Sequence, residues 1–329
     1  MKIRLSLLAL LLLIIASCNN NGDESQETKD TTALIPAIEI PSLDVDTAYQ
    51  FIQSQVDFGP RVPGTTAQKQ CAAWLEKKLK QYCDTVYKQD VTVKAGNGKI
   101  LPCINLVGAI HPRAQRRILL VSHWDSRPWA DQDTKDKDKP ILSADDCASG
   151  VGLLLEIARA LQHKPIPEDV GIDIFFTDVE DYGKTEWGDE SYALGTQYWA
   201  AHPHVSGYKA SYGILVDMVG ARGARFPLEG YSKQLAPAVQ QKVWEAANNA
   251  GFSSYFVYDD GGFITDDHVF VNKIAGIPTI DIINLQQTTQ TSFAAHWHTH
   301  NDNMSIIDKA TLKAVGTTLL YVVYGESSQ

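Results

Sequence analysis

Short apolar runs alternate with stretches of helical spacing along most of the chain. The runs predict β-strands over residues 91–93, 104–110, 118–122, 170–177, 212–217 and 277–283. The stretches predict helices over residues 47–56, 66–81, 148–161, 191–201, 233–250 and 309–324. Strands that alternate with helices indicate a largely parallel sheet that helices cover on both faces. The pattern therefore predicts an α/β fold.

The first residues have the composition of an export signal. Lys2 and Arg4 precede an apolar run over residues 5–16, which is shorter than the roughly 20 residues that span a bilayer. The ending Ile15-Ala16-Ser17-Cys18 resembles a bacterial lipobox, which implies that Cys18 is lipidated and becomes the mature N-terminus. The alternative is an ordinary signal peptide followed by an incidental cysteine. We expect a lipoprotein signal peptide at residues 1–17 and an exported bacterial lipoprotein of the cell envelope, in the periplasm or the outer membrane.

The rest of the chain divides into a tether and one domain. The polar segment after Cys18 predicts a flexible tether over residues 18–42. Residues 43–329 contain no Gly/Ser linker, low-complexity break or internal repeat, so we expect a single domain there. Four further cysteines (Cys71, Cys83, Cys103 and Cys147) match no zinc spacing, and we interpret them as structural without deriving any pairing.

Composition excludes one class of partner. The 329 residues include 29 Lys+Arg and 39 Asp+Glu, a formal net charge of −10. Nucleic acid is held mainly by Lys and Arg that neutralise phosphates, so we expect no nucleic-acid partner. Hydrophobic residues at 44% and charged residues at 21% are typical of a globular chain with a sizeable core.

Acidic and histidine side chains follow the predicted strands. They lie in segments 119–125, 143–150, 174–181, 214–220 and 295–300. In parallel sheets, ligands gather where strands end. Imidazole and carboxylate are the ligands expected for zinc, and a catalytic zinc keeps three protein ligands and one open position. The pattern therefore predicts a zinc site at this edge of the sheet.

Each of these segments also has a simpler interpretation. His123 and Asp125 could form a structural pair, and Asp145 or Asp146 could cap the following helix. Glu180 and Asp181 could lie on a solvated turn, and the histidines at 296, 298 and 300 could form an exposed tract without function. The zinc interpretation is favoured because all five segments occur in order at the ends of buried strands.

The ordered motifs resemble a known family. His123-x-Asp125, Asp146-x-x-Ser149-Gly150, Glu180-Asp181, Asp217-Met-x-Gly220 and His298-Thr299, with Phe58-Gly-Pro-Arg-Val-Pro-Gly64 ahead of them, resemble the aminopeptidase family of zinc exopeptidases. The resemblance implies a single three-layer α/β domain in which helices flank a mixed, largely parallel central sheet.

Other features are more similar to one branch of that family, the animal-type glutaminyl-peptide cyclotransferases and their bacterial lipoprotein relatives. These features are Ile264-Thr-Asp-Asp-His-Val269, Trp297 directly before His298, Phe293, Gly188-Asp-Glu-Ser191 and the segment from Arg117 to Asp131. Such enzymes convert N-terminal glutaminyl residues of peptides or proteins to pyroglutamyl residues and release ammonia. The resemblance implies these substrates and a membrane contact through the lipid anchor on Cys18.

The same resemblance assigns roles to individual residues. It implies that Asp146, Asp181 and His298 bind one zinc ion per chain. Asp181 departs from the Glu of the animal enzymes and is shorter by one methylene. The resemblance further implies that Glu180 is the general acid/base within an acid network, and that three aromatic residues line the substrate pocket. The network residues are Asp217 and Asp266, and the pocket residues are Trp297, Phe293 and Trp187.

Two other functions stay open at this point. A two-zinc aminopeptidase would use His123 and Asp217 in a second metal site, with Asp146 as the bridge and Glu180 activating a water. The segment 265–268 and the Trp297-His298 pair weigh against it. A lipoprotein that only binds a ligand is the third class, and the intact Glu180 and ligand set weigh against that.

Overall fold

The computed structural model describes residues 39–326. The predicted signal peptide, Cys18 and nearly all of the tether lie outside these residues. The helices are α1 (Val45–Val56), α2 (Thr66–Tyr82), α3 (Gly150–His163), α4 (Leu194–Ala201), α5 (Gly230–Leu235), α6 (Pro237–Asn249), α7 (Asp267–Phe270) and α8 (Lys309–Gly325). The strands are β1 (Thr85–Lys94), β2 (Ile100–Ile110), β3 (Arg116–His123), β4 (Val170–Thr177), β5 (Tyr212–Asp217), β6 (Phe226–Leu228), β7 (Phe256–Asp260) and β8 (Thr279–Ile283).

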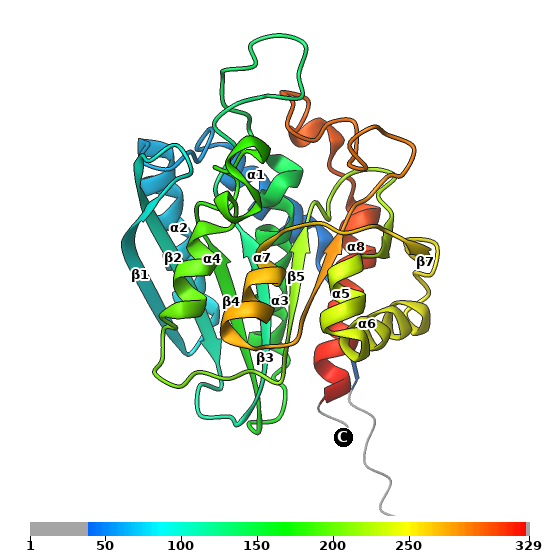
Figure 1. Cartoon of the computed structure of the whole chain (residues 1–329). Helices are drawn as coiled ribbons and strands as arrows, with labels where there is room; N and C mark the ends of the chain where they lie inside the picture. Colours follow the sequence, from blue (N-terminus) through cyan, green and yellow to red (C-terminus); the bar gives the residue numbers. More distant parts are fainter. Residues whose placement is uncertain (1–38, 327–329) are drawn as a thin grey trace, which may run out of the picture. The chain divides into compact units, whose positions relative to one another are not determined.

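A six-stranded mixed sheet forms the centre of the fold (Figure 1). Its strand order is β1-β2-β4-β3-β5-β8. The pairs β3/β4, β3/β5 and β5/β8 are parallel, whereas β1/β2 and β2/β4 are antiparallel. Helices connect the parallel strands, as crossover connections require. The predicted mixed, largely parallel sheet flanked by helices is confirmed.

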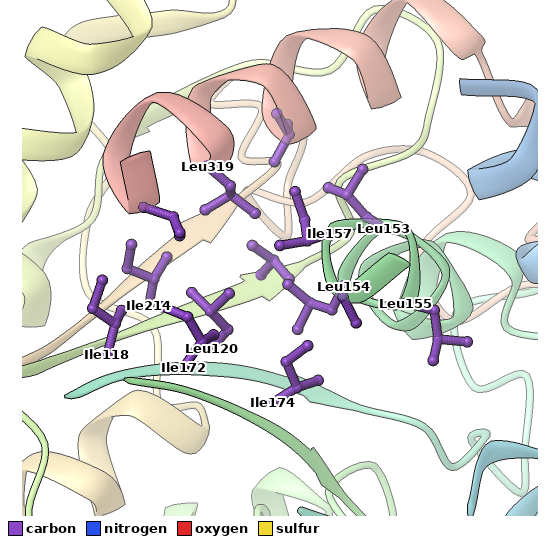
Figure 2. Packing of buried hydrophobic residues seen from close by; sticks show 14 of the residues in the cluster. Ile118, Leu120, Leu153, Leu154, Leu155, Ile157, Ile172, Ile174, Ile214 and Leu319 are labelled. Atoms are coloured by element: carbon purple, nitrogen blue, oxygen red, sulfur yellow. The ribbon is translucent and has the colours of Figure 1, made fainter. Parts of the chain in front are cut away.

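Both faces of the sheet are buried, and β3 shows this directly. Ile118 and Leu120 belong to the larger core cluster, which also contains Leu154 of α3 and Leu319 of α8. Figure 2 shows these side chains packed between the strands and the two helices. The alternate residues Leu119 and Val121 pack in a second cluster with Trp199 of α4. Each fully buried side chain of this kind contributes about 1.5–3 kcal/mol.

The structure contains β6, β7 and α7, which the sequence pattern did not predict, and it shifts the bounds of several predicted elements. Two of these shifts have a clear physical cause. The helix expected over residues 233–250 is interrupted at Ala236, and Pro237 starts α6 as a new helix, since proline has no N–H for the preceding turn. Strand β1 extends well beyond the expected residues 91–93, because it pairs with β2 from Thr85 opposite Ala109 to Lys94 opposite Ile100. Its alternating exposed residues suit an edge strand and do not produce a continuous apolar run.

Two further observations concern the described residues only. None of their helices is both long and apolar enough to cross a membrane. All four of their cysteines, Cys71, Cys83, Cys103 and Cys147, are free thiols, and three of them are buried.

Candidate metal centre and active site

Three parallel strands bring the acidic and histidine residues to one edge of the sheet. β3 ends at His123, Glu180 and Asp181 follow β4, and β5 ends at Asp217. Asp146 comes from the turn that precedes α3, and His298 from the loop that follows β8. This is the edge at which ligands bind in open α/β sheets.

Asp146, Asp181 and His298 form one group that could hold a metal ion. All three are buried, and each offers a ligand atom within 4.8 Å of the others. Nε2 of His298 lies 3.3 Å from Oδ1 of Asp181 and 3.7 Å from Oδ2 of Asp146. The predicted zinc ligands are thus brought together from three separate segments.

The electrostatics of this group fit a cation. Burial and the charges of Asp181 and Asp217 raise the pKa of Asp146 to about 6. Oδ2 of Asp181 is buried and has no hydrogen-bond partner in the described part of the chain. Unpaired carboxylates are costly to bury, and a divalent ion removes that cost. One histidine and two carboxylates suit zinc.

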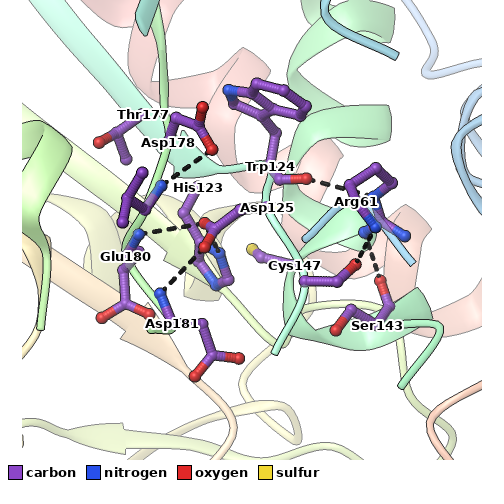
Figure 3. A network of polar contacts seen from close by, with 12 residues as sticks. Arg61, His123, Trp124, Asp125, Ser143, Cys147, Thr177, Asp178, Glu180 and Asp181 are labelled. Carbon is purple, nitrogen blue, oxygen red and sulfur yellow. Dashed lines mark hydrogen bonds and ion pairs between the residues drawn. The ribbon is translucent and has the colours of Figure 1, made fainter. Parts of the chain in front are cut away.

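Asp125 fixes the turn that carries Glu180 and Asp181. Its carboxylate accepts hydrogen bonds from the backbone N–H groups of Glu180 (3.1 Å) and Asp181 (3.2 Å). It also lies 3.3 Å from Nδ1 of His123 (Figure 3). The His123–Asp125 pair therefore exists, but it additionally positions the two residues next to the candidate metal site.

Arg61 gives the 58–64 motif a structural role. The guanidinium of Arg61 is fully buried and donates to the backbone oxygens of Trp124 (3.2 Å) and Ser143 (2.9 Å). Figure 3 shows Arg61 between the end of β3 and the turn that leads to Asp146. One cation thus holds together two backbone segments that supply residues to the site.

Three of the eight described non-glycine residues with positive φ lie beside the site. Val179, Met218 and His298 have left-handed φ angles of 56°, 48° and 54°. Such angles are uncommon for residues other than glycine, and a β-branched valine there is an outlier. Val179 is held in place because its N–H donates to Oδ1 of Asp178 (2.9 Å) and its oxygen accepts from Leu194 (3.0 Å). Such strain clusters at functional sites.

Glu180 is a buried carboxyl group, 8% exposed. Burial raises its pKa well above the ordinary value, and Asp266, Asp181 and Asp267 add to the rise against the opposing effect of His123. Burial, together with Asp217 and Asp267, likewise raises the pKa of Asp266. A buried carboxyl group whose pKa is raised holds its proton more tightly than an exposed one, which suits general acid–base chemistry.

His123 lies between two carboxylates. Its Nε2 is 3.0 Å from Oδ1 of Asp146 and 3.4 Å from Oδ1 of Asp217. Burial lowers the pKa of His123, but Cys147 and the hydrogen bonds to Asp125, Asp146 and Asp217 outweigh it, and the net direction is upward. The His123 ring can therefore bridge the two carboxylates. His123, Cys147 and Asp217 form a second group whose ligand atoms are close enough to hold an ion.

A pocket of about 390 Å³ opens onto this group. Its acidic lining residues are Asp146, Glu180, Asp181, Asp189, Asp217 and Asp266. Its aromatic lining residues are Tyr192, Tyr231, Phe263, Phe293 and Trp297. The rings of Phe293 and Trp297 stack with centroids 4.2 Å apart, and Trp297 lies 3.7 Å from the ring of His298. Two of the three predicted aromatic residues, Phe293 and Trp297, are thus next to the candidate metal group.

Trp187 has a different position. It is not among the described residues that line this pocket. Its ring packs edge-on against Trp129, with centroids 5.9 Å apart, in a cluster with Tyr182. The predicted contact of Trp187 with substrate therefore has no support in this geometry.

The other two histidines of the triplet face other carboxylates. Nε2 of His296 lies 2.9 Å from Oδ2 of Asp145, and Nδ1 of His300 lies 2.9 Å from Asp133. Oδ1 of Asp145 accepts the N–H of Gly220 (2.7 Å), and no side chain caps α3. Neither the helix-cap interpretation nor the exposed-tract interpretation describes these residues.

Sequence reasoning missed two charged residues beside the site. Nη1 of Arg127 donates to Oδ1 of Asp181 (2.7 Å), which leaves Oδ2 free for an ion. Arg127 also pairs with Asp131 (2.7 Å), which lies next to His298. Both residues lie in the 117–131 segment. Arg127 and Asp131 are four residues apart, a spacing that is common for ion pairs, and this was the signal in the sequence that could have found them.

Comparison with known proteins agrees with this geometry. Residues 105–323 match the model of peptidase family M28. A glutaminyl-peptide cyclotransferase from Gloydius blomhoffii is 26% identical over 239 residues, which are 63% of this chain and 61% of that protein. The chain thus spans about three fifths of that curated relative.

Solved structures match over nearly their whole length. Glutaminyl cyclase from Tannerella forsythia is 49% identical with a TM-score of 0.83, and the match covers 86% of this chain and 99% of that one. A Zn-dependent exopeptidase from Parabacteroides distasonis is 45% identical with a TM-score of 0.85, covering 87% and 99%. The family match extends over well more than half of the sequence, and the chain belongs to peptidase family M28.

Proposed function

We propose that this protein is a glutaminyl-peptide cyclotransferase, which converts N-terminal glutaminyl residues of peptides or proteins to pyroglutamyl residues and releases ammonia. The observation that carries the proposal is the buried carboxyl group of Glu180, with its raised pKa, beside a three-residue metal-binding group in a pocket with an aromatic wall. The likeness to the Tannerella glutaminyl cyclase and to the curated cyclotransferases supports it.

Asp146, Asp181 and His298 would hold one zinc ion. When bound, zinc supplies Lewis acidity that polarises the side-chain amide carbonyl of the substrate glutamine. Asp181 is one methylene shorter than the glutamate of the animal enzymes. The hydrogen bond from Arg127 holds one of its carboxylate oxygens in place, and the other oxygen has no partner among the described residues, so it is available to the ion.

Glu180 would move the proton. The substrate's α-amine nitrogen forms a bond to the side-chain amide carbon, and the bond from that carbon to the amide nitrogen breaks. Glu180 takes a proton from the attacking amine and gives it to the departing nitrogen, which leaves as ammonia. Its raised pKa makes it a better proton acceptor than an ordinary carboxylate and lets it return that proton to the leaving nitrogen. Asp217 and Asp266 would complete the acid network, since both line the same pocket.

The aromatic wall would favour cyclisation over hydrolysis. Nucleophile and amide belong to the same glutamine residue, so the pocket needs to hold only one reactive conformer. The stacked rings of Phe293 and Trp297 cover one side of the lining next to His298. An apolar wall at that position limits the water that competes with the amine.

A combined measurement of zinc content and product tests this function. The purified protein is assayed for ammonia release from a Gln-initiated peptide and for amino acid release from a Leu-initiated peptide. One zinc per chain with ammonia release supports the cyclotransferase. Two zinc ions with free leucine would instead establish the aminopeptidase, and a folded, zinc-loaded protein with neither activity would contradict both enzymatic functions.

We also propose that Cys18 carries a lipid anchor. The basic start, the apolar run and the lipobox-like ending of the sequence support this. The enzyme would then be held at a membrane of the bacterial cell envelope and would act on peptides or proteins outside the cytoplasm.

A further inference from the structure

An aromatic pair lies at the solvent edge of the pocket. Tyr231 lies in the first turn of α5, and Phe263 lies in the loop after β7. Their ring centroids are 5.0 Å apart with the planes at 76°. Phe263 is 63% exposed although it lines the pocket, which places its ring where the pocket meets water. An exposed phenylalanine at a pocket rim offers apolar surface to a ligand.

Buried hydrogen bonds hold this pair in position. Glu229 is fully buried, and its Oε1 accepts the backbone N–H groups of Tyr231 (2.8 Å) and Ile264 (3.1 Å). Its other oxygen lies 3.0 Å from Nε2 of His268. One carboxylate thus ties the start of α5 to the loop that carries Phe263.

The Phe263 ring also packs directly on a glycine. The N–H of Gly230 donates to the oxygen of Gly262 (2.6 Å). A Cβ atom added at Gly230 would lie 2.7 Å from the Phe263 ring, so only glycine lets the ring lie this close. The rim is therefore ordered before any ligand binds, which lowers the entropy cost of binding.

The carboxyl groups that line the pocket disfavour acidic ligands. The described lining contains six carboxyl groups and no lysine or arginine. Asp189, on the rim, accepts a hydrogen bond from Thr265 (3.4 Å). Lys273 lies 5.6 Å from the centroid of the Tyr231 ring but is not part of the lining. A carboxylate inside the pocket rim would meet the like charge of Asp189, whereas Lys273 lies over the Tyr231 ring from outside the lining.

We propose that Tyr231 and Phe263 form the subsite for the residue that follows the N-terminal glutamine, and that this subsite favours aromatic and large apolar side chains over acidic ones. The inference rests on the proposed function. With the glutamine amide at Asp146, Asp181 and His298 and the α-amine at Glu180, the rest of the peptide leaves toward the solvent edge. The second residue is then the first to meet the rim.

The test compares three dipeptide amides, Gln-Phe, Gln-Ala and Gln-Glu, on the intact protein and two variants. Phe263→Ala removes the rim aromatic. Tyr258→Ala is the matched control, because Tyr258 on β7 is 57% exposed and does not line the pocket. The parent should turn over Gln-Phe with the highest kcat/KM and Gln-Glu with the lowest. Phe263→Ala should lower kcat/KM about 3- to 10-fold for Gln-Phe and less than twofold for Gln-Ala.

Phe263→Lys adds a gain of function to the same test. It should raise kcat/KM for Gln-Glu relative to Gln-Ala, because it places a cation where the second side chain lies. Equal loss on Gln-Phe and Gln-Ala in Phe263→Ala, or equal effects of Phe263→Ala and Tyr258→Ala, would overturn the subsite. A folded, zinc-loaded parent that cyclises none of the three would refute the proposed function itself. Cyclisation without preference for the second residue would refute the subsite alone.

Discussion

Oδ1 of Asp131 lies 3.3 Å from Nδ1 of His298, on the opposite side of the imidazole from Nε2, which faces Asp146 and Asp181. Arg127 pairs with the same carboxylate and donates to Asp181. Burial would raise the pKa of Asp131, but hydrogen bonds and charges from Arg127 and His298 hold it well below its ordinary value. One ion pair therefore orients two of the three candidate metal ligands.

Asp131→Asn should weaken zinc binding while the fold persists. A carboxylate that accepts the second N–H of a ligand histidine sets its orientation and raises its basicity, and losing such a partner typically costs about 10- to 100-fold in metal affinity. Competition with a chromophoric chelator measures the affinity. Asp138→Asn is the control, because Asp138 is exposed on the same loop. Equal affinity in both variants would remove Asp131 from the metal site.

Glu180→Gln should abolish most turnover and keep the zinc. The change is nearly isosteric, and Glu180 is not one of the three ligands, so zinc content and melting temperature should match the parent. General acid–base catalysis contributes about 10²- to 10⁴-fold, and the upper end is expected because one group both takes and returns the proton. Ammonia release from a Gln-initiated dipeptide provides the rate. Turnover within a few-fold of the parent would leave Asp266 as the next candidate.

His298→Ala should lose stoichiometric zinc and activity together. His296→Ala and His300→Ala should retain the metal, since those rings face Asp145 and Asp133 instead. His123→Ala should also keep one zinc ion, because His123 bridges carboxylates in the one-zinc arrangement. Metal analysis of the four variants distinguishes these cases. Loss of one of two ions in His123→Ala would favour the two-zinc site.

The lowered pKa of Glu229 should make the folding stability of the protein decrease in acid. Burial would raise its pKa, but hydrogen bonds from His268 and Ser232 lower it to about 2. The folded pKa is below the unfolded value of about 4.3, so this contribution is present at neutral pH and is lost as pH falls from about 4 toward 2. Glu229→Gln should therefore lower the melting temperature more at pH 7 than at pH 3. If Glu229→Gln lowers the melting temperature equally at pH 7 and at pH 3, ionised Glu229 does not stabilise the fold in this way.

Cys18→Ser should release the protein from the membrane fraction. Without the thiol no lipid can be attached, and the apolar run is expected to be removed with the signal peptide. Fractionation after a high-salt wash, with immunodetection, gives the distribution. A variant that stays membrane-bound and is processed at the same position would refute the anchor.

Local sequence patterns were sufficient to predict much of the fold and of the candidate site. The period of the apolar residues predicted β3, β4, β5 and β8, and hence a largely parallel sheet with ligands at its edge. The order of motifs placed Asp146, Glu180, Asp181, Asp217 and His298 there, because the carboxyl ends of parallel strands share one edge of the sheet and the loops after them start at that edge. These are consequences of short-range spacing.

Long-range packing decided the rest. Asp131 and Arg127 reach the ligands only because their loop packs against the one that carries His298, far along the chain. Tyr231 and Phe263 meet because buried Glu229 joins the start of α5 to the loop after β7, and neither residue lies in an apolar period that would mark it. Trp187 is adjacent in sequence to the site motifs, yet it packs on Trp129 outside the pocket. Sequence spacing specifies which face of an element a side chain occupies, whereas its neighbours depend on how separate elements pack in three dimensions.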